Sequence, residues 1–295
     1  MAKNSLKIVQ EQADGSFAEM SDLATGDARG DNAIDLCTKR SNAAYVPSGI
    51  CSANIAGEDI GGSGTHSLIS GKKNYTNTGN YCLISGNYNY NNSGDYCSIT
   101  GYRNYSNEGD YCSISGNGNS SNSGDYCSIS GQGNHNNAAS HCIIGGKDND
   151  YIHADADYSL ICGELNSKTG TDASEGSHCI IGGKNNYNNS GNYCSISGYG
   201  NYNNDGDWCS ISGLGHNTNS GDWCSISGLA NYTNIGDYCS IAGRFNYNNS
   251  GDYCSIAGRF NHSNEGHYCS ISGYRTYSNE GHYCSISGLA NNTNI

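Results

Sequence analysis

A short block of alternating apolar and polar residues recurs along most of this chain. The stretch Tyr96-Cys97-Ser98-Ile99-Thr100-Gly101 represents it, and its commonest form is Gly-Asp-Tyr-Cys-Ser-Ile-Ser-Gly. Copies follow one another mostly every fifteen residues. A fixed period this short is typical of a solenoid, in which each repeat is one coil stacked on the coil before it.

The alternation within the block predicts which side chains point inward. With the cysteine numbered as position 1, positions 1 and 3 share one face, and positions 2, 4 and 15 share the other. Only the Cys/Ile face is apolar, so we expect it to form the core. Isoleucine is expected at position 3 from Ile55 to Ile286, and glycine at position 5 from Gly57 to Gly288. The expected core ladder contains Cys82, Cys97, Cys112, Cys127, Cys142, Cys179, Cys194, Cys209, Cys224, Cys239, Cys254, Cys269 and Cys284, with Ile84, Ile99, Ile114 and Ile129 among its isoleucines.

The second half of each coil is rich in asparagine, as in Asn89-Tyr90-Asn91-Asn92. We expect positions 8 and 10 to point inward, where stacked amides can bond along the axis, and the tyrosine at position 9 to point outward. Glycine at positions 5 and 13 is expected to take left-handed backbone angles at corners. The predicted fold class is therefore all-β: a parallel β-solenoid of about 15-residue coils, roughly 75 Å long at the ordinary strand spacing.

The repeats divide the chain into two parts. Residues 1–52 do not repeat and are interpreted as a cap or docking segment, in which Leu6–Gln10 and Ser16–Met20 could pair as a hairpin. Residues 53–295 form the solenoid, with insertions at about 150–157 and 168–175. Arg29-Gly30-Asp31 spells an integrin-type tripeptide, a match that is common by chance. The last repeat stops midway, which suggests an open coil edge able to pair with another chain.

Composition narrows the class of protein. The net charge of −13 argues against a nucleic-acid partner. No run of about 18 apolar residues is present, so no membrane span is expected. The N-terminus lacks the apolar core of a secretory signal. We therefore expect folding in a reducing cytosol, with an extracellular fibre or a virion appendage as an open possibility for the final location.

The cysteines are expected to be free, buried thiols. Equivalent cysteines on stacked strands have parallel Cα–Cβ bonds, which suit a disulfide poorly. Fifteen-residue spacing without a Cys-x-x-Cys pair builds no tetrahedral metal site. Cys37, Cys51 and Cys162 lie outside the ladder and are better candidates for a bridge or a subunit contact.

Two sets of acidic residues are candidates for ion binding. Asp148, Asp150, Asp155 and Asp157, with His153, could hold Ca²⁺, although a solvated loop is the favoured interpretation. Aspartates at position 14 form a column in which like charges repel, and solvation is the expected relief; they are Asp95, Asp110, Asp125, Asp207, Asp222, Asp237 and Asp252. No nucleophile–base pair, phosphate loop or paired carboxylate stands out. The sequence therefore predicts no enzyme, no catalytic residue, no metal and no cofactor.

The repeat frame resembles the head repeats of YadA-type trimeric adhesins and the related repeats of phage tail-fibre proteins. The blocks Ser177–Asn186 and Tyr158–Gly163 carry the likeness best, and it covers about residues 53–295. The resemblance implies a left-handed parallel β-roll, often trimeric, used in fibres and attachment. The period of mostly fifteen, the Cys and Asn in place of Ser and Ala, and the missing secretion signal and membrane anchor depart from those adhesins, so their secretion route does not carry over.

Outward aromatic residues are the most informative surface feature. One predicted ladder contains Tyr81, Tyr96, Tyr111, Tyr126, Tyr193, Trp208, Trp223, Tyr238, Tyr253, Tyr268 and Tyr283. A second contains Tyr75, Tyr90, Tyr105, Tyr187, Tyr202, Tyr232, Tyr247 and Tyr277. Aromatic residues favour strands in any case, but long exposed rows are typical of interfaces.

The sequence thus predicts a non-catalytic structural protein that assembles into a filament, fibre or trimeric spike through open ends and aromatic ladders. The expected partner is a second copy of the chain, with a cell-surface or glycan target as a further candidate. One alternative is a phage-type tail fibre that binds a receptor. Another is an ice-binding solenoid, in which Ser98, Ser113, Ser115, Ser128 and Ser130 would belong to flat hydroxyl ladders.

Overall fold

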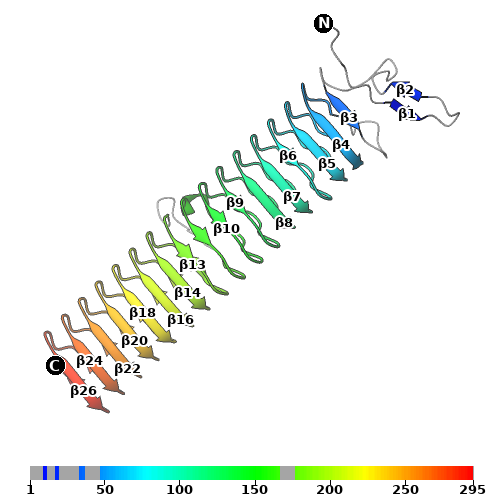
Figure 1. Ribbon diagram of the computed structural model, residues 1–295. Coiled ribbons are helices and arrows are strands. Elements are labelled where there is room, and N and C mark those ends of the chain that lie inside the picture. The colour runs from blue at the N-terminus through cyan, green and yellow to red at the C-terminus, as the bar shows by residue number, and fades with distance from the viewer. Residues whose placement is uncertain (1–8, 12–16, 20–32, 37–46, 167–176, 295) are drawn as a thin grey trace, which may run out of the picture.

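The computed structural model describes residues 9–11, 17–19, 33–36, 47–166 and 177–294. The repeats wind into a rod of stacked coils, with about 16 turns of roughly 15 residues (Figure 1). The predicted parallel β-solenoid is therefore confirmed. Within the described ranges the only helical element is one 3₁₀ turn, η1 (Ala154–Ala156).

One parallel sheet runs the length of the rod and contains the Cys/Ile block of every coil. Its strands pair in register, so that Ile211 lies opposite Ile226 and Gly213 opposite Gly228. In spatial order they are β3 (Ile34–Leu36), β4 (Ala53–Glu58), β5 (Leu68–Lys72), β6 (Leu83–Ile84), β7 (Ser98–Tyr102), β8 (Ser113–Asn117), β9 (Ser128–Ile129), β10 (Ile143–Ile144), β11 (Leu160–Ile161), β12 (Ile180–Ile181), β14 (Ser195–Tyr199), β16 (Ser210–Leu214), β18 (Ser225–Leu229), β20 (Ser240–Arg244), β22 (Ser255–Arg259), β24 (Ser270–Tyr274) and β26 (Ser285–Leu289).

A second parallel sheet is built from positions 9 to 11 of the later coils. It contains β13 (Tyr187–Asn189), β15 (Tyr202–Asn204), β17 (Asn217–Asn219), β19 (Tyr232–Asn234), β21 (Tyr247–Asn249), β23 (His262–Asn264), β25 (Tyr277–Asn279) and β27 (Asn292–Asn294). In earlier coils the same positions meet through single bridges, such as Tyr90 with Tyr105 and Tyr105 with Ser120.

The first coil departs from the expected register. Asn54 pairs with Ile69, and Ile55 pairs with Ser70, because the pairing shifts between Ile55 and Gly57. The expectation that Ile55 points inward is therefore wrong: Ile55 is 38% exposed and Asn54 is fully buried. An extra residue in one strand moves the preceding side chains to the other face. The NH₂ group of Asn54 donates there to the carbonyl oxygen of Ile60 at 3.0 Å.

The parallel sheet also starts before the expected boundary at residue 53, because β3 pairs with β4. Further upstream, β1 (Val9–Glu11) and β2 (Phe17–Glu19) pair antiparallel, with Gln10 opposite Ala18. This pairing lies close to the ranges expected for a hairpin. The Arg-Gly-Asp tripeptide lies outside the described residues.

The buried core is a stack of isoleucine and cysteine side chains. Ile84 to Ile271 at position 3 are at most 1% exposed, and Cys82 to Cys269 at most 4%, whereas Cys284 is only partly buried. The Cys97 thiol lies 3.3 Å from the carbonyl oxygen of Asp95 and 3.2 Å from that of Gly109. Its sulfur also accepts the backbone N–H of Cys112 at 3.4 Å. The cysteines therefore join consecutive coils as well as filling the core.

Two columns of buried asparagine complete the interior, at positions 8 and 11. At position 8, the Asn104 amide donates to Thr100 at 2.7 Å, and its oxygen accepts the N–H of Asn119 at 3.0 Å. At position 11, Asn107 donates to the Asn92 oxygen at 2.9 Å. The expectation that position 10 points inward is wrong. Position 10 takes left-handed angles, as at Ser106 with φ 52°, and this turn breaks the strand alternation so that position 11 faces inward instead.

The glycines that recur at positions 5 and 13 have different structural roles. At position 5 the glycine is left-handed as predicted, with φ 111° at Gly101. At position 13 the left-handed expectation is wrong. A Cβ on Gly94 would lie 2.0 Å from the carbonyl oxygen of Gly109, so glycine is required at Gly94 because these consecutive coils approach closely; Ala139 takes the same position in the coil before the first insertion.

Candidate interaction surfaces

A continuous column of fifteen stacked aromatic rings follows one edge of the rod; we call it the main aromatic column. Adjacent ring centroids lie 4.1 to 6.0 Å apart. The structure places all eleven residues of the first predicted ladder in this column, and His66, His141, Tyr158 and His178 fill the gaps between them. The rings are about half exposed, as for Tyr96 at 49% and Trp223 at 50%.

The backbone orients the main aromatic column. Each residue at position 15 takes left-handed angles, as at Tyr111 with φ 57°, and its N–H donates to the coil before it, at 2.8 Å from Tyr111 to the Asp95 carbonyl. Parallel stacking covers the ring faces, so the edges and phenol groups meet solvent. Desolvation between Tyr96 and Tyr126 raises the pKa of the Tyr111 phenol. The Tyr111 phenol is therefore a neutral hydrogen-bonding group at pH 7.

The second aromatic row, at position 9, is interrupted. Its longest stacks are Tyr75–Tyr90–Tyr105 and Tyr232–Tyr247–His262–Tyr277. Tyr187 stacks on Tyr202 alone in the middle of the rod.

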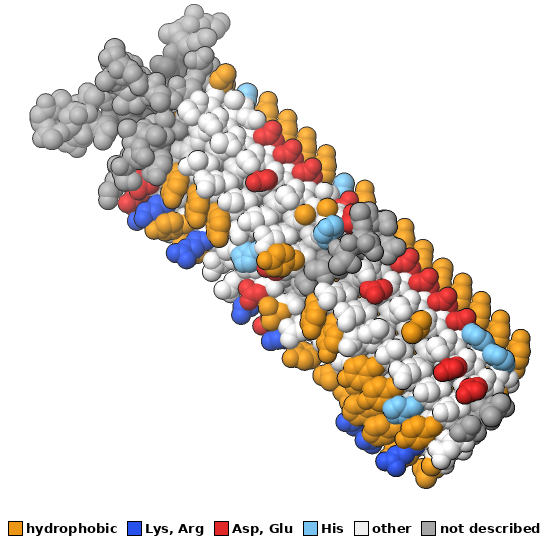
Figure 2. Space-filling model, turned by 180° about the vertical axis from the view of Figure 1, so that it is seen from behind, with side chains coloured by type: hydrophobic (Ala, Val, Ile, Leu, Met, Phe, Trp, Pro, Cys, Tyr) orange, Lys and Arg blue, Asp and Glu red, His pale blue; other side chains and the backbone are white. Residues whose placement is uncertain are grey.

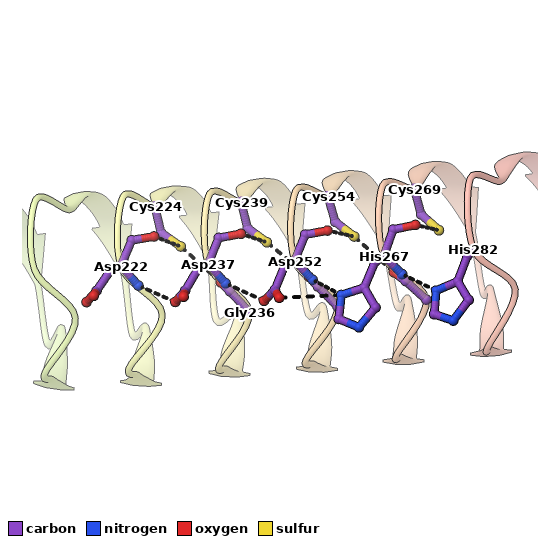
Figure 3. A network of polar contacts seen from close by, with 12 residues as sticks. Asp222, Cys224, Gly236, Asp237, Cys239, Asp252, Cys254, His267, Cys269 and His282 are labelled. Atoms are coloured by element: carbon purple, nitrogen blue, oxygen red, sulfur yellow. Dashed lines mark hydrogen bonds and ion pairs between the residues drawn. The ribbon is translucent and has the colours of Figure 1, made fainter.

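Beside the main aromatic column runs an acidic column at position 14, which comprises Asp95, Asp110, Asp125, Asp157, Asp207, Asp222, Asp237 and Asp252. Each carboxylate accepts the backbone N–H of the same position one coil earlier, at 2.8 Å from Asp222 to Asp237 (Figure 3). His267 and His282 continue the column and accept through Nδ1. Solvation is the expected relief for the like charges, and the structure adds a backbone hydrogen bond to each carboxylate of the column.

The acidic insertion does not gather into one site. Asp148 lies 3.7 Å from Lys147, Asp150 accepts from Asn136, and Asp155 pairs with His153 at 2.9 Å. Asp157 belongs to the acidic column and accepts the N–H of Ser140 at 2.6 Å. Among the described residues, no group of three or more His, Cys, Asp or Glu side chains is arranged to hold a metal ion.

Sequence reasoning missed a cationic edge. All eight described Lys and Arg residues lie at positions 6 and 7 of their coils: Lys72, Lys73, Lys147, Lys184, Arg103, Arg244, Arg259 and Arg275. Tabulating Lys and Arg by repeat position would have revealed it. Lys72 and Lys184 pair with glutamates of the preceding coil at 2.9 and 3.1 Å.

The arginines of the cationic edge lie against aromatic rings. Arg244 and Arg259 sit 5.1 and 4.8 Å from the rings of Phe245 and Phe260. These are cation–π contacts, and they leave the guanidinium groups without an ion-pair partner among the described residues. Figure 2 shows the Lys and Arg side chains along one long side of the rod, and the acidic and aromatic columns along the other.

A polar hollow interrupts the cationic edge near the middle of the rod. It has a volume of about 570 Å³ and forms where Gly118 and Gly133 replace larger side chains at position 7. Tyr105, Arg103 and His135 are among its walls. Tyr105 is the last ring of its stack, because the next residue in the row is Ser120.

The remaining predicted residues are placed as follows. Ser98, Ser113 and Ser128 lie at position 2 on the outer face of the main sheet, with Ser115 and Ser130 beside them at position 4. Exposed Leu83 and Ile143 interrupt the position 2 row. Cys51 and Cys162 are free and exposed, and Cys37 lies outside the described residues.

Comparison with known proteins adds no family to this description. No family model matches the chain, and no curated protein matches it. No helix in the described ranges has the length and apolar character needed to cross a membrane. The fold and surfaces define the class of protein directly: a parallel β-solenoid with stacked aromatic, asparagine and cysteine columns.

Proposed function

We propose that this chain is a non-catalytic structural protein that associates with copies of itself into a fibre, filament or spike. The observation that carries the proposal is the main aromatic column, which runs unbroken from His66 to Tyr283. Rows of half-exposed Tyr and Trp are apolar at the ring edge and polar at the hydroxyl, and such surfaces are enriched at protein interfaces.

The repeat itself supports association with a second copy. Each coil presents the same groups at the same axial spacing of about 4.8 Å, so two rods placed side by side match at every coil. Weak contacts that recur along a rod add as in any multivalent interaction.

Negative-stain electron microscopy and sedimentation velocity of the full chain with reductant test this proposal. We expect assemblies larger than one rod. Changing Tyr238, Tyr253 and Tyr268 to Ser should weaken them, whereas the same change at Tyr232 and Tyr247 in the second row is the matched control. A wild-type chain that stays monomeric at every concentration would refute self-association.

A receptor-binding role, as in the adhesins and tail fibres that the repeats resemble, is the second candidate. The polar hollow beside Tyr105 favours it, since an aromatic face with planar polar neighbours suits a sugar ring. Glycan-array binding that is lost in a Gly118→Trp/Gly133→Trp variant would support this role. Absence of binding by the wild-type chain would count against it.

Ice binding remains a third proposal, which rests on the serine rows of the main sheet. From Ser195 to Ser285 every coil carries serine at position 2. Thermal hysteresis by a monomer that never assembles would favour ice binding over fibre formation.

A further inference from the structure

The cations on the described part of the rod are confined to one edge, which they share with Glu58, Asp148 and Glu164. All eight described cations lie at positions 6 and 7, and eight aspartates form the acidic column at position 14. The two sets face opposite sides of the rod in Figure 2. A solvated surface has no need of this sorting, because mixed signs would reduce the repulsion between stacked like charges.

Most of these charges lack a partner within one chain. Among the described residues, Arg103, Arg244, Arg259 and Arg275 make cation–π contacts but no ion pair. The aspartates give one oxygen to a backbone N–H of the neighbouring coil, as Asp237 does for Asp222. Within the same ranges, Asp252 is the one column member with an ion-pair partner, His267 at 3.5 Å. Apart from Asp95, whose second oxygen accepts from the Asn80 amide at 3.3 Å, and Asp252, the outer carboxylate oxygens of the described acidic column remain available to a cation from outside.

From this sorting we infer that the rods associate side by side, with the cationic edge of one copy on the acidic column of the next. The inference rests on the proposed self-association and names its surface. Arg244, Arg259 and Arg275 lie on three consecutive coils, so their spacing along the rod matches that of Asp222, Asp237 and Asp252. Because the two surfaces lie on opposite sides of one rod, the contact is heterologous and each added copy offers a fresh edge for another.

The aromatic groups fit this arrangement. The acidic column runs directly beside the main aromatic column, and Asp252, Tyr253, His267 and Tyr268 share the walls of one hollow of about 360 Å³. The cationic edge carries its own aromatic rings, Phe245 and Phe260, under the arginines. Docking therefore brings together charges of opposite sign and aromatic edges in one contact.

Two full-length variants test the inference from opposite sides. Variant one carries Arg244→Glu, Arg259→Glu and Arg275→Glu. Variant two carries Asp222→Asn, Asp237→Asn and Asp252→Asn, which removes charge but keeps the oxygen that accepts the backbone N–H, as Asn192 already does for Ser177 at 2.8 Å. Circular dichroism checks that both fold. Ser240→Glu/Ser255→Glu/Ser270→Glu on the main sheet is the control for added negative charge.

Sedimentation velocity at low salt gives the readout. We expect each variant alone to associate roughly tenfold to hundredfold more weakly than the wild type, and the serine control to associate normally. An equimolar mixture should form one-to-one pairs, because variant one keeps its acidic column and variant two keeps its cationic edge. Salt should dissociate the wild-type assemblies.

The outcomes separate the inference from the proposed function. Wild-type assemblies that both variants form equally well would overturn the charged lateral contact and leave self-association standing. A wild type that is monomeric at low salt would overturn both.

Discussion

His216 Nδ1 accepts the backbone N–H of Asn231 at 3.2 Å, where the other coils use an asparagine oxygen. Its Nε2 lies 2.9 Å from the Ser212 carbonyl oxygen and takes the place of the asparagine NH₂ group. Both bonds together require the neutral imidazole with its proton on Nε2. One buried ring thus reproduces the hydrogen bonding of an amide, and it introduces a titratable group into the core.

This substitution predicts a pH-dependent stability. Desolvation lowers the pKa of His216 below 6.5, so the native state keeps the ring neutral after the unfolded state has taken up a proton. The free energy of unfolding should therefore fall as the pH drops below 6.5, until the lowered native pKa is reached. His216→Asn should remove this part of the pH dependence, since it restores the amide column. Urea unfolding at pH 7.5 and 5.5 measures both proteins, and identical pH dependence in the two would contradict the assignment.

The isoleucines of β12 provide a matched pair. Ile181 is fully buried, whereas its neighbour Ile180 is 53% exposed. Ile181→Ala should cost about 2–5 kcal/mol of unfolding free energy because it leaves a cavity. Ile180→Ala should change stability by about 0.5 kcal/mol or less. Equal effects in a denaturation series would show that the strand register is wrong.

Gly94, at position 13 of its coil, should tolerate no side chain. In Gly94→Ala the new methyl group would meet the Gly109 carbonyl oxygen at 2.0 Å, and the coils would have to separate, at a cost of about 3 kcal/mol or more. Gly215 is the control, because it is left-handed with φ 71° but has open space around it. Gly215→Ala should cost only about 1–2 kcal/mol. A larger fall in the urea midpoint for Gly215→Ala than for Gly94→Ala would contradict this account.

Thiol reactivity should separate the cysteines into two groups. Contact with the neighbouring thiol of Cys112, together with burial, raises the pKa of Cys97 to about 12, so at neutral pH the Cys97 thiol is protonated and inaccessible. In a Cys37→Ser background, iodoacetamide should modify Cys51 and Cys162 in the native protein, and the buried ladder from Cys82 to Cys269 only after denaturation. Mass spectrometry of peptides gives the positions. Rapid native labelling of Cys97 would contradict the buried ladder.

Much of the core follows from the repeat alone. The inward direction of Cys97 and Ile99 needs only the alternation of a strand, and the parallel stacking needs only the period. One of the two asparagine columns, at position 8, was predicted from the sequence. The inward direction of position 8 follows from the pattern. The left-handed turn at Ser106, which directs Asn107 inward, has no sequence signature, because Asn, Ser and Thr all occur at that position.

The candidate surfaces could likewise be predicted only in part from the sequence. Eleven of the fifteen rings of the main aromatic column were predicted, because they occupy one repeat position; His66, His141, Tyr158 and His178 were not among them. The bond from Asp222 to Asp237 could not be read from spacing, since it depends on which side of a tight corner the backbone N–H faces. The sequence contains the repeat positions of the Lys and Arg residues. Only the structure shows that positions 6 and 14 lie on opposite sides of the rod.

The sequence by itself determined the period, the all-β class and the set of residues in each column, because a side chain that recurs every coil must occupy one line along the axis. The tertiary structure alone decided how each column is used. Backbone angles at the corners decide that position 11 faces inward and that the glycine at position 13 is needed for close approach. They also decide that the cationic edge and the acidic column lie on opposite sides of the rod. Those choices depend on contacts between coils fifteen residues apart, and no local pattern contains them.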